Sequence, residues 1–152
     1  MSPLFTIPLW VDLVAVGLAS LQAATLAAQA QRRGIDLLGV TIVGIAAGLG
    51  GGILRDVLIG VPPATFSTNE YIVVAALAAL GGMLLERAVA RIAVVITLLD
   101  ALSIGMFCAI GVSKAIAAGV PFVPAITIGV VAAVGGGMLR DLLLDTPIAV
   151  MH

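Results

Sequence analysis

The amino-acid sequence predicts an all-α membrane protein, a polytopic bundle of transmembrane helices, and two observations lead to this prediction. Of the 152 residues, 62% are hydrophobic and only 10% are charged, and the mean hydropathy is +1.28. Soluble domains carry charge on about a quarter of their residues, so this chain has too little polar surface for a water-soluble fold. Glycine is also abundant, with 18 residues, which suits helices that approach one another closely in lipid.

Charged residues divide the chain into five apolar segments, at about 8–29, 35–59, 71–85, 92–117 and 122–144. We expect each segment to form a helix, because lipid offers no water to unpaired backbone groups. About 20 apolar residues are needed to cross the hydrocarbon layer, so the third segment is short. Glu70 and Glu86, which flank it, are expected at the level of the lipid headgroups.

The distribution of Lys and Arg predicts the orientation of these helices. Arg32 and Arg33 follow the first segment, and Arg87 and Arg91 follow the third, whereas the N-terminal segment and the connection 60–70 contain no Lys or Arg. Because cytoplasmic connections are enriched in basic residues, we expect the N-terminus on the outside of the membrane.

The chain contains an internal repeat at an offset of 85 residues. Residues 44–62 return as residues 129–147, with ten of nineteen aligned positions identical, and the start of the first segment is echoed in the fourth. Three helices separate the copies, so the second copy must enter the membrane from the opposite side, which predicts inverted repeats. We therefore expect a first repeat of three transmembrane helices in residues 1–86. The second, inverted repeat, residues 92–152, would hold two helices and the start of a third.

The inverted repeat also bears on the length of the chain. A sixth helix, the partner of the third, would begin near residues 147–152. We expect the sequence to be an incomplete copy of a longer protein, and a natural five-helix protein is the alternative.

Each copy contains three consecutive glycines, which we predict to be the hinge of a pore. Glycine costs about 1 kcal/mol relative to alanine within a helix, so an apolar pattern alone does not require it. Three in a row would allow the second and fifth helices to break near the bilayer midplane. Close helix packing through small residues is the alternative. These glycines are Gly50, Gly51, Gly52, Gly135, Gly136 and Gly137.

Ionisable residues inside the apolar segments form the second group of candidate functional residues. Adjacent residues on a helix point about 100° apart, so we expect the Arg of each Arg-Asp pair to need a partner other than the neighbouring Asp. Matching depths in the membrane predict that Asp12 pairs with Arg55. They likewise predict that Asp100 pairs with Arg140. Ion pairs that only lock the bundle are the alternative. The charges are Asp12, Arg55, Asp56, Asp100, Lys114, Arg140 and Asp141.

Lys114 is the one basic residue that disagrees with the predicted orientation, because it lies near the outer end of the fourth segment. It could extend along the helix to the membrane surface. Alternatively, it could be an exposed cation at an outer mouth, where it would repel entering cations.

The sequence argues against several classes of function. The glycine triplets are not followed by the Lys-Ser/Thr of a phosphate-binding loop, and no catalytic dyad or triad is present, so we expect no enzyme and no cofactor. His152 is the only histidine, which leaves no pattern for a metal site. The net charge of −1, without a basic cluster, makes nucleic acid an unsuitable partner.

The twin Gly-Gly-Gly-x-x-Arg-Asp segments resemble the TRIC family of trimeric intracellular cation channels. The Asp-Ala-Leu-Ser-Ile-Gly run at Asp100 and the approach from Pro62 to Tyr71 carry the same resemblance. The likeness is to prokaryotic members in particular, which overlap with small bacterial proteins described as glycine-transporter domains.

This resemblance implies seven helices, in two inverted three-helix repeats plus one, and a homotrimer in the lipid bilayer. It further implies a channel for monovalent cations, K⁺ or Na⁺, in a prokaryotic cytoplasmic (inner) membrane. Helices 1, 2, 4 and 5 would line one pore in each subunit. No carbonyl-ring filter sequence is present, so we expect weak discrimination between K⁺ and Na⁺.

Two other functions remain open at this stage. Inverted repeats with broken helices suit the carboxylate of a small zwitterion such as glycine equally well, so a secondary transporter is the first alternative. An accessory membrane scaffold without a solute pathway is the second.

Overall fold

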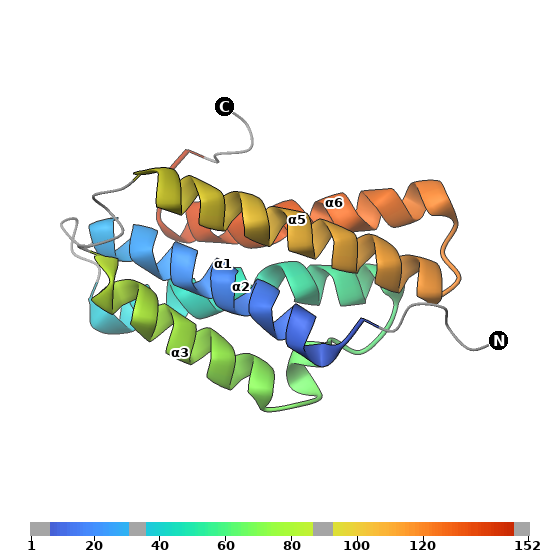
Figure 1. Ribbon diagram of the computed structural model, residues 1–152, viewed down its shortest axis with the longest axis horizontal. Coiled ribbons are helices and arrows are strands. Elements are labelled where there is room, and N and C mark those ends of the chain that lie inside the picture. Colours follow the sequence, from blue (N-terminus) through green and yellow to red (C-terminus); the bar gives the residue numbers. More distant parts are fainter. Residues whose placement is uncertain (1–6, 31–35, 87–92, 148–152) are drawn as a thin grey trace.

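The structure is a computed structural model that describes residues 7–30, 36–86 and 93–147. The described residues form a helical bundle, with helices labelled as in Figure 1. The helices are α1 (Leu9–Ala30), α2 (Leu37–Ile59), the short 3₁₀ helix η2 (Ala64–Phe66), α3 (Glu70–Leu84), α5 (Ala93–Ala117) and α6 (Phe122–Leu143). The five longer helices match the five expected segments, and the all-α prediction is confirmed.

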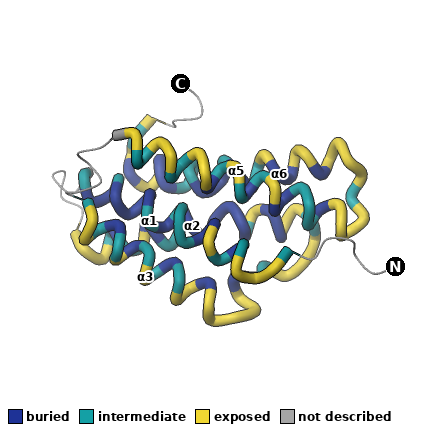
Figure 2. The backbone as a smooth tube through the Cα atoms, in the orientation of Figure 1, coloured by how far each residue is buried: buried dark blue, intermediate teal, exposed yellow. Residues whose placement is uncertain are grey.

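Four of these helices are long and apolar enough to cross a membrane, namely α1, α2, α5 and α6. Helix α3 has only 15 residues, as its short apolar segment predicts. Large apolar side chains cover the outside of the bundle, including Trp10, Phe66, Leu84 and Phe122, each at least 65% exposed. Exposed positions lie on the outer faces of the helices in Figure 2. Such a surface belongs in lipid, where large apolar side chains need no cover.

The helix ends follow from local sequence signals. The Oδ1 of Asp36 accepts a hydrogen bond from the Gly39 N–H at 2.8 Å and caps the start of α2. Gly60 ends α2 in a left-handed conformation, with φ 81°, which a residue without a Cβ adopts at little cost. The chain then turns through η2 into α3.

The helices stack in three layers, with α1 and α2 between α3 on one side and α5 and α6 on the other (Figure 1). Successive long helices run in opposite directions, so α1 ends and α2 begins at the same end of the bundle as the end of α3 and the start of α5. The basic residues Arg32, Arg33, Arg87 and Arg91 lie outside the described residues. The expected start of a sixth helix at 148–152 also lies outside them.

Small residues make up most of the core. Alanines at ten core positions are at most 2% exposed, which allows the helix axes to approach closely. They are Ala15, Ala23, Ala24, Ala27, Ala47, Ala75, Ala79, Ala115, Ala125 and Ala132.

The prediction that α2 and α6 break at the glycine triplets is wrong. Both helices continue through the triplets without interruption. The triplets instead form the point where α2 and α6 cross. A Cβ atom on Gly51 would collide with the carbonyl oxygen of Ala132, and one on Gly136 would collide with the carbonyl oxygen of Ala47. The triplets therefore serve close helix packing, which was the alternative interpretation of the sequence.

The contacts at this crossing are repeated with the two helices exchanged. Gly136 and Ala132 lie 85 positions after Gly51 and Ala47, the same offset as in the sequence repeat. A Cβ on Gly50 would likewise meet Leu139, whereas a Cβ on Gly135 would meet Leu54. The crossing therefore depends on both triplets together.

We predict that Gly51→Ala lowers stability while Gly105→Ala does not. The added methyl at Gly51 meets a backbone carbonyl, so α2 and α6 must separate, at a cost of about 1–3 kcal/mol. A Cβ at Gly105 meets nothing within 4 Å, so the same substitution there should be neutral or stabilising by up to about 1 kcal/mol. Thermal unfolding of the purified protein in detergent measures the difference, and equal midpoints for the two variants would contradict the crossing.

Candidate functional site

The charged residues inside the bundle gather in two clusters. The Asp12 cluster consists of Asp12, Arg55, Asp56, Tyr71 and Lys114. The Asp100 cluster consists of Gln22, Asp100, Arg140 and Asp141. Each cluster has members from α1, from α5 and from one helix that carries a glycine triplet, although these members are far apart in the sequence.

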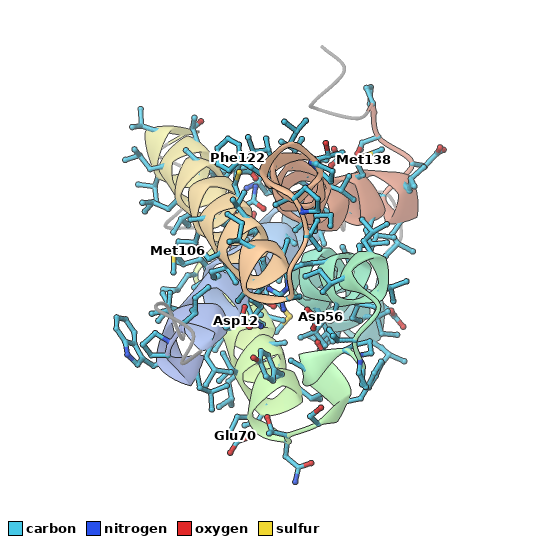
Figure 3. All side chains as sticks on the ribbon, turned by 90° about the vertical axis from the view of Figure 1, so that its right-hand side faces the viewer. Asp12, Asp56, Glu70, Met106, Phe122 and Met138 are labelled. Carbon is cyan, nitrogen blue, oxygen red and sulfur yellow. The ribbon has the colours of Figure 1, made fainter. Side chains whose placement is uncertain are left out.

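In the Asp12 cluster, one buried carboxylate accepts three hydrogen bonds. Asp12 is 3% exposed, and its Oδ1 accepts from the Nη1 of Arg55 at 3.3 Å. Its Oδ2 accepts from the hydroxyl of Tyr71 at 2.8 Å and from the Nζ of Lys114 at 2.7 Å. Asp12 therefore ties α1 to α2, α3 and α5. Figure 3, which looks along the bundle from this end, shows Asp12 at the centre of the surrounding helices.

Arg55 also contacts the aspartate next to it in the sequence. Its Nε donates to the Oδ1 of Asp56 at 2.7 Å, and the Oδ2 of Asp56 accepts from the backbone N–H of Ala64 at 2.9 Å. Asp56 thus fixes the start of η2 as well as the guanidinium. Arg55 therefore has the second partner that the sequence predicts, Asp12, and also contacts its neighbouring Asp, because the long arginine side chain spans the angle between adjacent positions.

The same arrangement recurs in the Asp100 cluster. The Nε of Arg140 donates to the Oδ1 of Asp141 at 2.7 Å. Its Nη1 donates to the Oε1 of Gln22 at 2.8 Å and to the Oδ1 of Asp100 at 3.4 Å. The two pairs expected from depth, Asp12 with Arg55 and Asp100 with Arg140, are therefore both present.

The third glycine of each triplet lies beside the arginine of its own helix. A Cβ on Gly52 would lie 3.7 Å from the Nη2 of Arg55, and a Cβ on Gly137 would lie 3.7 Å from the Nη2 of Arg140. The guanidinium thus folds back along the helix toward the triplet, the direction that long helical side chains favour. The first two glycines of each triplet pack the helices, and the third lies along the arginine.

Lys114 differs from both interpretations made from the sequence. It does not extend freely to the membrane surface, because its Nζ forms an ion pair with Asp12. It is not fully exposed either, since 30% of its side chain is accessible. The pairing of Lys114 with Asp12 follows from the apolar environment, because a buried carboxylate strongly attracts a nearby cation.

Two members of the clusters, Tyr71 and Gln22, are not among the functional residues predicted from the sequence. Tyr71 is the only tyrosine, and it opens the third apolar segment, where its hydroxyl reaches Asp12. Gln22 is a polar residue in the interior of the first segment and is 4% exposed. Polar residues in transmembrane segments are functional candidates by default, and that signal applied to uncharged side chains would have found Gln22.

Two cavities adjoin the clusters. A cavity of about 30 Å³ borders Gln22, Asp100, Ser103 and Arg140, and residues of α1, α2, α5 and α6 all line it. At the other end of the bundle, a cavity of about 250 Å³ borders Asp56 and Lys114. The described residues contain no group of three His, Cys, Asp or Glu side chains that could hold a metal ion.

The sequence matches a family model described as "Glycine transporter" over residues 9–87 and 97–152. A UPF0126 membrane protein of Deinococcus radiodurans is 32% identical over 144 residues, which cover 94% of this chain and 66% of the relative. The UPF0126 inner membrane protein YadS of Escherichia coli K12 is 30% identical over 136 residues, covering 88% of this chain and 64% of the relative. The chain thus spans slightly less than two thirds of the length of these relatives.

Solved structures of TRIC channels share the fold. The TRIC trimeric intracellular cation channel orthologue from Rhodobacter sphaeroides aligns with a TM-score of 0.85 and 26% identity, covering 94% of this chain and 73% of that chain. A prokaryotic TRIC channel crystallised in 0.5 M KCl aligns with a TM-score of 0.82 and 21% identity, covering 93% and 72%. The expected likeness to prokaryotic TRIC channels and to glycine-transporter domains is confirmed.

We predict that Asp12→Asn destabilises the protein more than Tyr71→Phe. The first change leaves Arg55 and Lys114 beside a neutral side chain, and breaking a buried ion pair costs about 3–5 kcal/mol. The second removes one of three donors to Asp12, a loss of about 0.5–1.5 kcal/mol. Unfolding in a denaturing detergent series measures both, and a smaller loss for Asp12→Asn would mean that Asp12 does not hold the cluster together.

Proposed function

Since the chain belongs to the bacterial membrane-protein family described as "Glycine transporter" and shares the fold of prokaryotic TRIC channels, we propose that it is a monovalent-cation channel. The permeant ions would be K⁺ and Na⁺, and the membrane a prokaryotic cytoplasmic (inner) membrane. The proteins that share the fold are channels and not enzymes, and we propose no catalytic activity.

One observation carries this proposal. The cavity at Asp100 is lined by α1, α2, α5 and α6, the four helices that the resemblance assigns to the pore. It reaches from Asp100 and Arg140 to Gly136 and Gly137 at the helix crossing. Polar side chains in a lipid-embedded bundle are retained where they face protein or a water-filled path. This placement supports a solute path through the interior of the chain.

The glycine triplets have a modified role in this proposal. They allow α2 and α6 to cross with backbone close to backbone, so a small shift of one helix along the other would change the space beside the crossing. We propose that the triplets act as the hinge of the pore in this sense. The charge clusters on the two sides of the crossing would then determine which ions approach it.

The remaining architecture is proposed on the basis of the repeat. Residues 1–86 and 92–152 would be inverted repeats related by an axis in the membrane plane, and the reciprocal contacts of the two triplets support this relation. The likeness to a trimeric TRIC channel supports a homotrimer, in which each subunit would contain one pore. The N-terminus would lie outside.

A secondary transporter of a small zwitterion is the second candidate, and the larger cavity favours it. Lys114 and Asp56 both border that cavity and would offer opposite charges to glycine. Both oxygens of Asp56, however, already accept hydrogen bonds, from Arg55 and Ala64, so the carboxylate is poorly placed to bind an ammonium group.

Recordings from the purified protein in a planar bilayer discriminate between the two functions. Discrete conductance steps in KCl and NaCl, with no glycine uptake into proteoliposomes, are expected for the channel. Saturable, ion-coupled glycine uptake without conductance steps would contradict it.

We predict that Lys114→Gln raises the cation current at low salt. The substitution removes the positive charge beside the larger cavity and leaves Asp12 with one cation fewer. The field of that charge is screened over about 8 Å at physiological ionic strength, so the increase should shrink in high salt. Lys114→Arg retains the charge and is the matched control. An unchanged current at both salt concentrations would exclude an electrostatic role for Lys114.

We predict that cysteines introduced at Arg32 and Arg87 are labelled from the same side of the membrane. Both connections join helix ends at one end of the bundle, and basic connections lie in the cytoplasm. A membrane-impermeant maleimide applied to intact cells should leave both unlabelled, and Cys108 should first be replaced by Ser. Labelling from outside would reverse the proposed orientation.

A further inference from the structure

Helix α5 carries three residues at intervals of seven positions, namely Asp100, Phe107 and Lys114. Residues seven positions apart lie on the same side of a helix, two turns and about 10 Å from one another along its axis. Asp100 pairs with Arg140 in the Asp100 cluster, and Lys114 pairs with Asp12 in the Asp12 cluster. Phe107 therefore lies midway between the two charge clusters.

The bundle is apolar at the level of Phe107. The residue is 3% exposed, and it belongs to a core cluster that includes Val16 of α1, Leu49 of α2 and Ala133 of α6. This core cluster thus draws on all four helices that line the proposed solute path. An ion that moves from one charge cluster to the other must pass this apolar level.

The two cavities lie on opposite sides of the Phe107 ring along α5. The smaller cavity, of about 30 Å³, is lined by Asp100, Ser103 and Phe107 on successive turns of this helix. The larger cavity, of about 250 Å³, borders Lys114 two turns beyond Phe107. The ring thus borders the smaller cavity on the side of the Asp12 cluster.

The internal repeat pairs this large side chain with a small one. Asp12 and Asp100 correspond at an offset of 88 residues, and at this offset Phe107 corresponds to Ala19. Both Phe107 and Ala19 line the smaller cavity, and Ala19 packs against the core cluster that contains Phe107. At this level one repeat supplies an aromatic ring, and the other supplies a methyl group.

We propose that the ring of Phe107 is the hydrophobic barrier of the ion path and separates the smaller cavity from the Asp12 cluster. The inference rests on the proposed channel function and deepens it, because it names the residue that regulates passage. A monovalent cation in an apolar constriction sheds water without gaining a ligand, so such a constriction stops ions. Conduction then requires the ring to turn away from the core cluster.

The barrier adjoins the proposed hinge. The smaller cavity is lined by Phe107 and also by Gly136 and Gly137 at the helix crossing. A shift of α6 along α2 would change the space beside these glycines, and with it the room into which the ring can turn. Movement at the crossing would thus act on passage through Phe107.

Flux of Rb⁺ into proteoliposomes tests the barrier. Phe107→Ala should raise the flux by roughly tenfold or more, because the apolar constriction is lost. Phe107→Leu keeps most of the apolar volume and should give an intermediate flux. Phe122→Ala makes the same change at a position of α6 that is 66% exposed, and should leave the flux unchanged. A measurable flux that is equal in wild type and in both Phe107 variants would leave the channel and overturn the barrier.

A double variant separates an opened path from a weakened core. Ala19→Phe combined with Phe107→Ala returns a ring to the same level from the other repeat and conserves the volume of the core. Its flux should fall back toward that of wild type. A flux as high as that of Phe107→Ala would mean that lost packing, and not the missing ring, opened the bundle, and would overturn the proposal.

Access of Ag⁺ to a cysteine locates the barrier without a measurement of conduction. Ser103→Cys places a thiol in the smaller cavity, in a protein that also carries Cys108→Ser. Ag⁺ binds thiols, so it should protect this cysteine from later labelling by a maleimide. With Phe107 present, we expect protection from one side of the membrane only, and with Phe107→Ala from either side. Any other pattern would overturn the proposal.

The two measurements together distinguish the barrier from the function on which it rests. Two-sided access of Ag⁺ in Phe107→Ala alone, in a protein that carries no Rb⁺ flux in any variant, would overturn the channel and leave the barrier. One-sided access in Phe107→Ala, in a protein that carries Rb⁺ flux, would leave the channel and overturn the barrier.

Discussion

The structure depends on the burial of two guanidinium groups in a bundle whose surroundings are lipid. An isolated charge at such a position is expensive, so each arginine must be surrounded by partners. Arg55 and Arg140 are 1% and 5% exposed, and each contacts the aspartate that follows it and a second acid from another helix. These contacts draw α1 and α5 against α2 and α6. The packing of the long helices is therefore determined by charge pairing as much as by apolar contact.

The glycine triplets make this pairing possible. The two arginines belong to α2 and α6, which cross at Gly51 and Gly136 with a carbonyl oxygen of each helix lying where the other would carry a Cβ. Any side chain at the crossing would separate the helices and move both guanidinium groups away from α1 and α5. The triplets are followed by Arg-Asp at the same distance in both copies because packing and charge pairing must occur at neighbouring points of one helix.

The sequence predicted the five helices and the two interhelical ion pairs, because hydropathy and depth in the membrane are properties of sequence position. It did not predict the contact between Arg55 and Asp56, since that contact depends on the path of a flexible side chain and not on the angle between Cα positions. The triplets were located correctly, but their continuity could not be inferred. Whether a glycine run bends or packs is decided by the helix that faces it, here α6 against α2. The pairing of Lys114 with Asp12 joins positions 102 apart and requires the tertiary arrangement.

The repeat explains why the two ends of the bundle are similar, and its differences explain why they are not equivalent. The residues shared between the copies, the triplets with their Arg-Asp pairs, build the same backbone crossing and the same guanidinium contacts twice. The residues that differ decide which side chains complete each cluster: Lys114 contacts Asp12 in one, and Gln22 contacts Arg140 in the other. A tethered cation makes the Asp12 cluster neutral and closes its carboxylate to other ligands. The Asp100 side chain, in contrast, is 35% exposed and lies 3.4 Å from Arg140, so the two ends of the bundle bury their corresponding carboxylates to different extents.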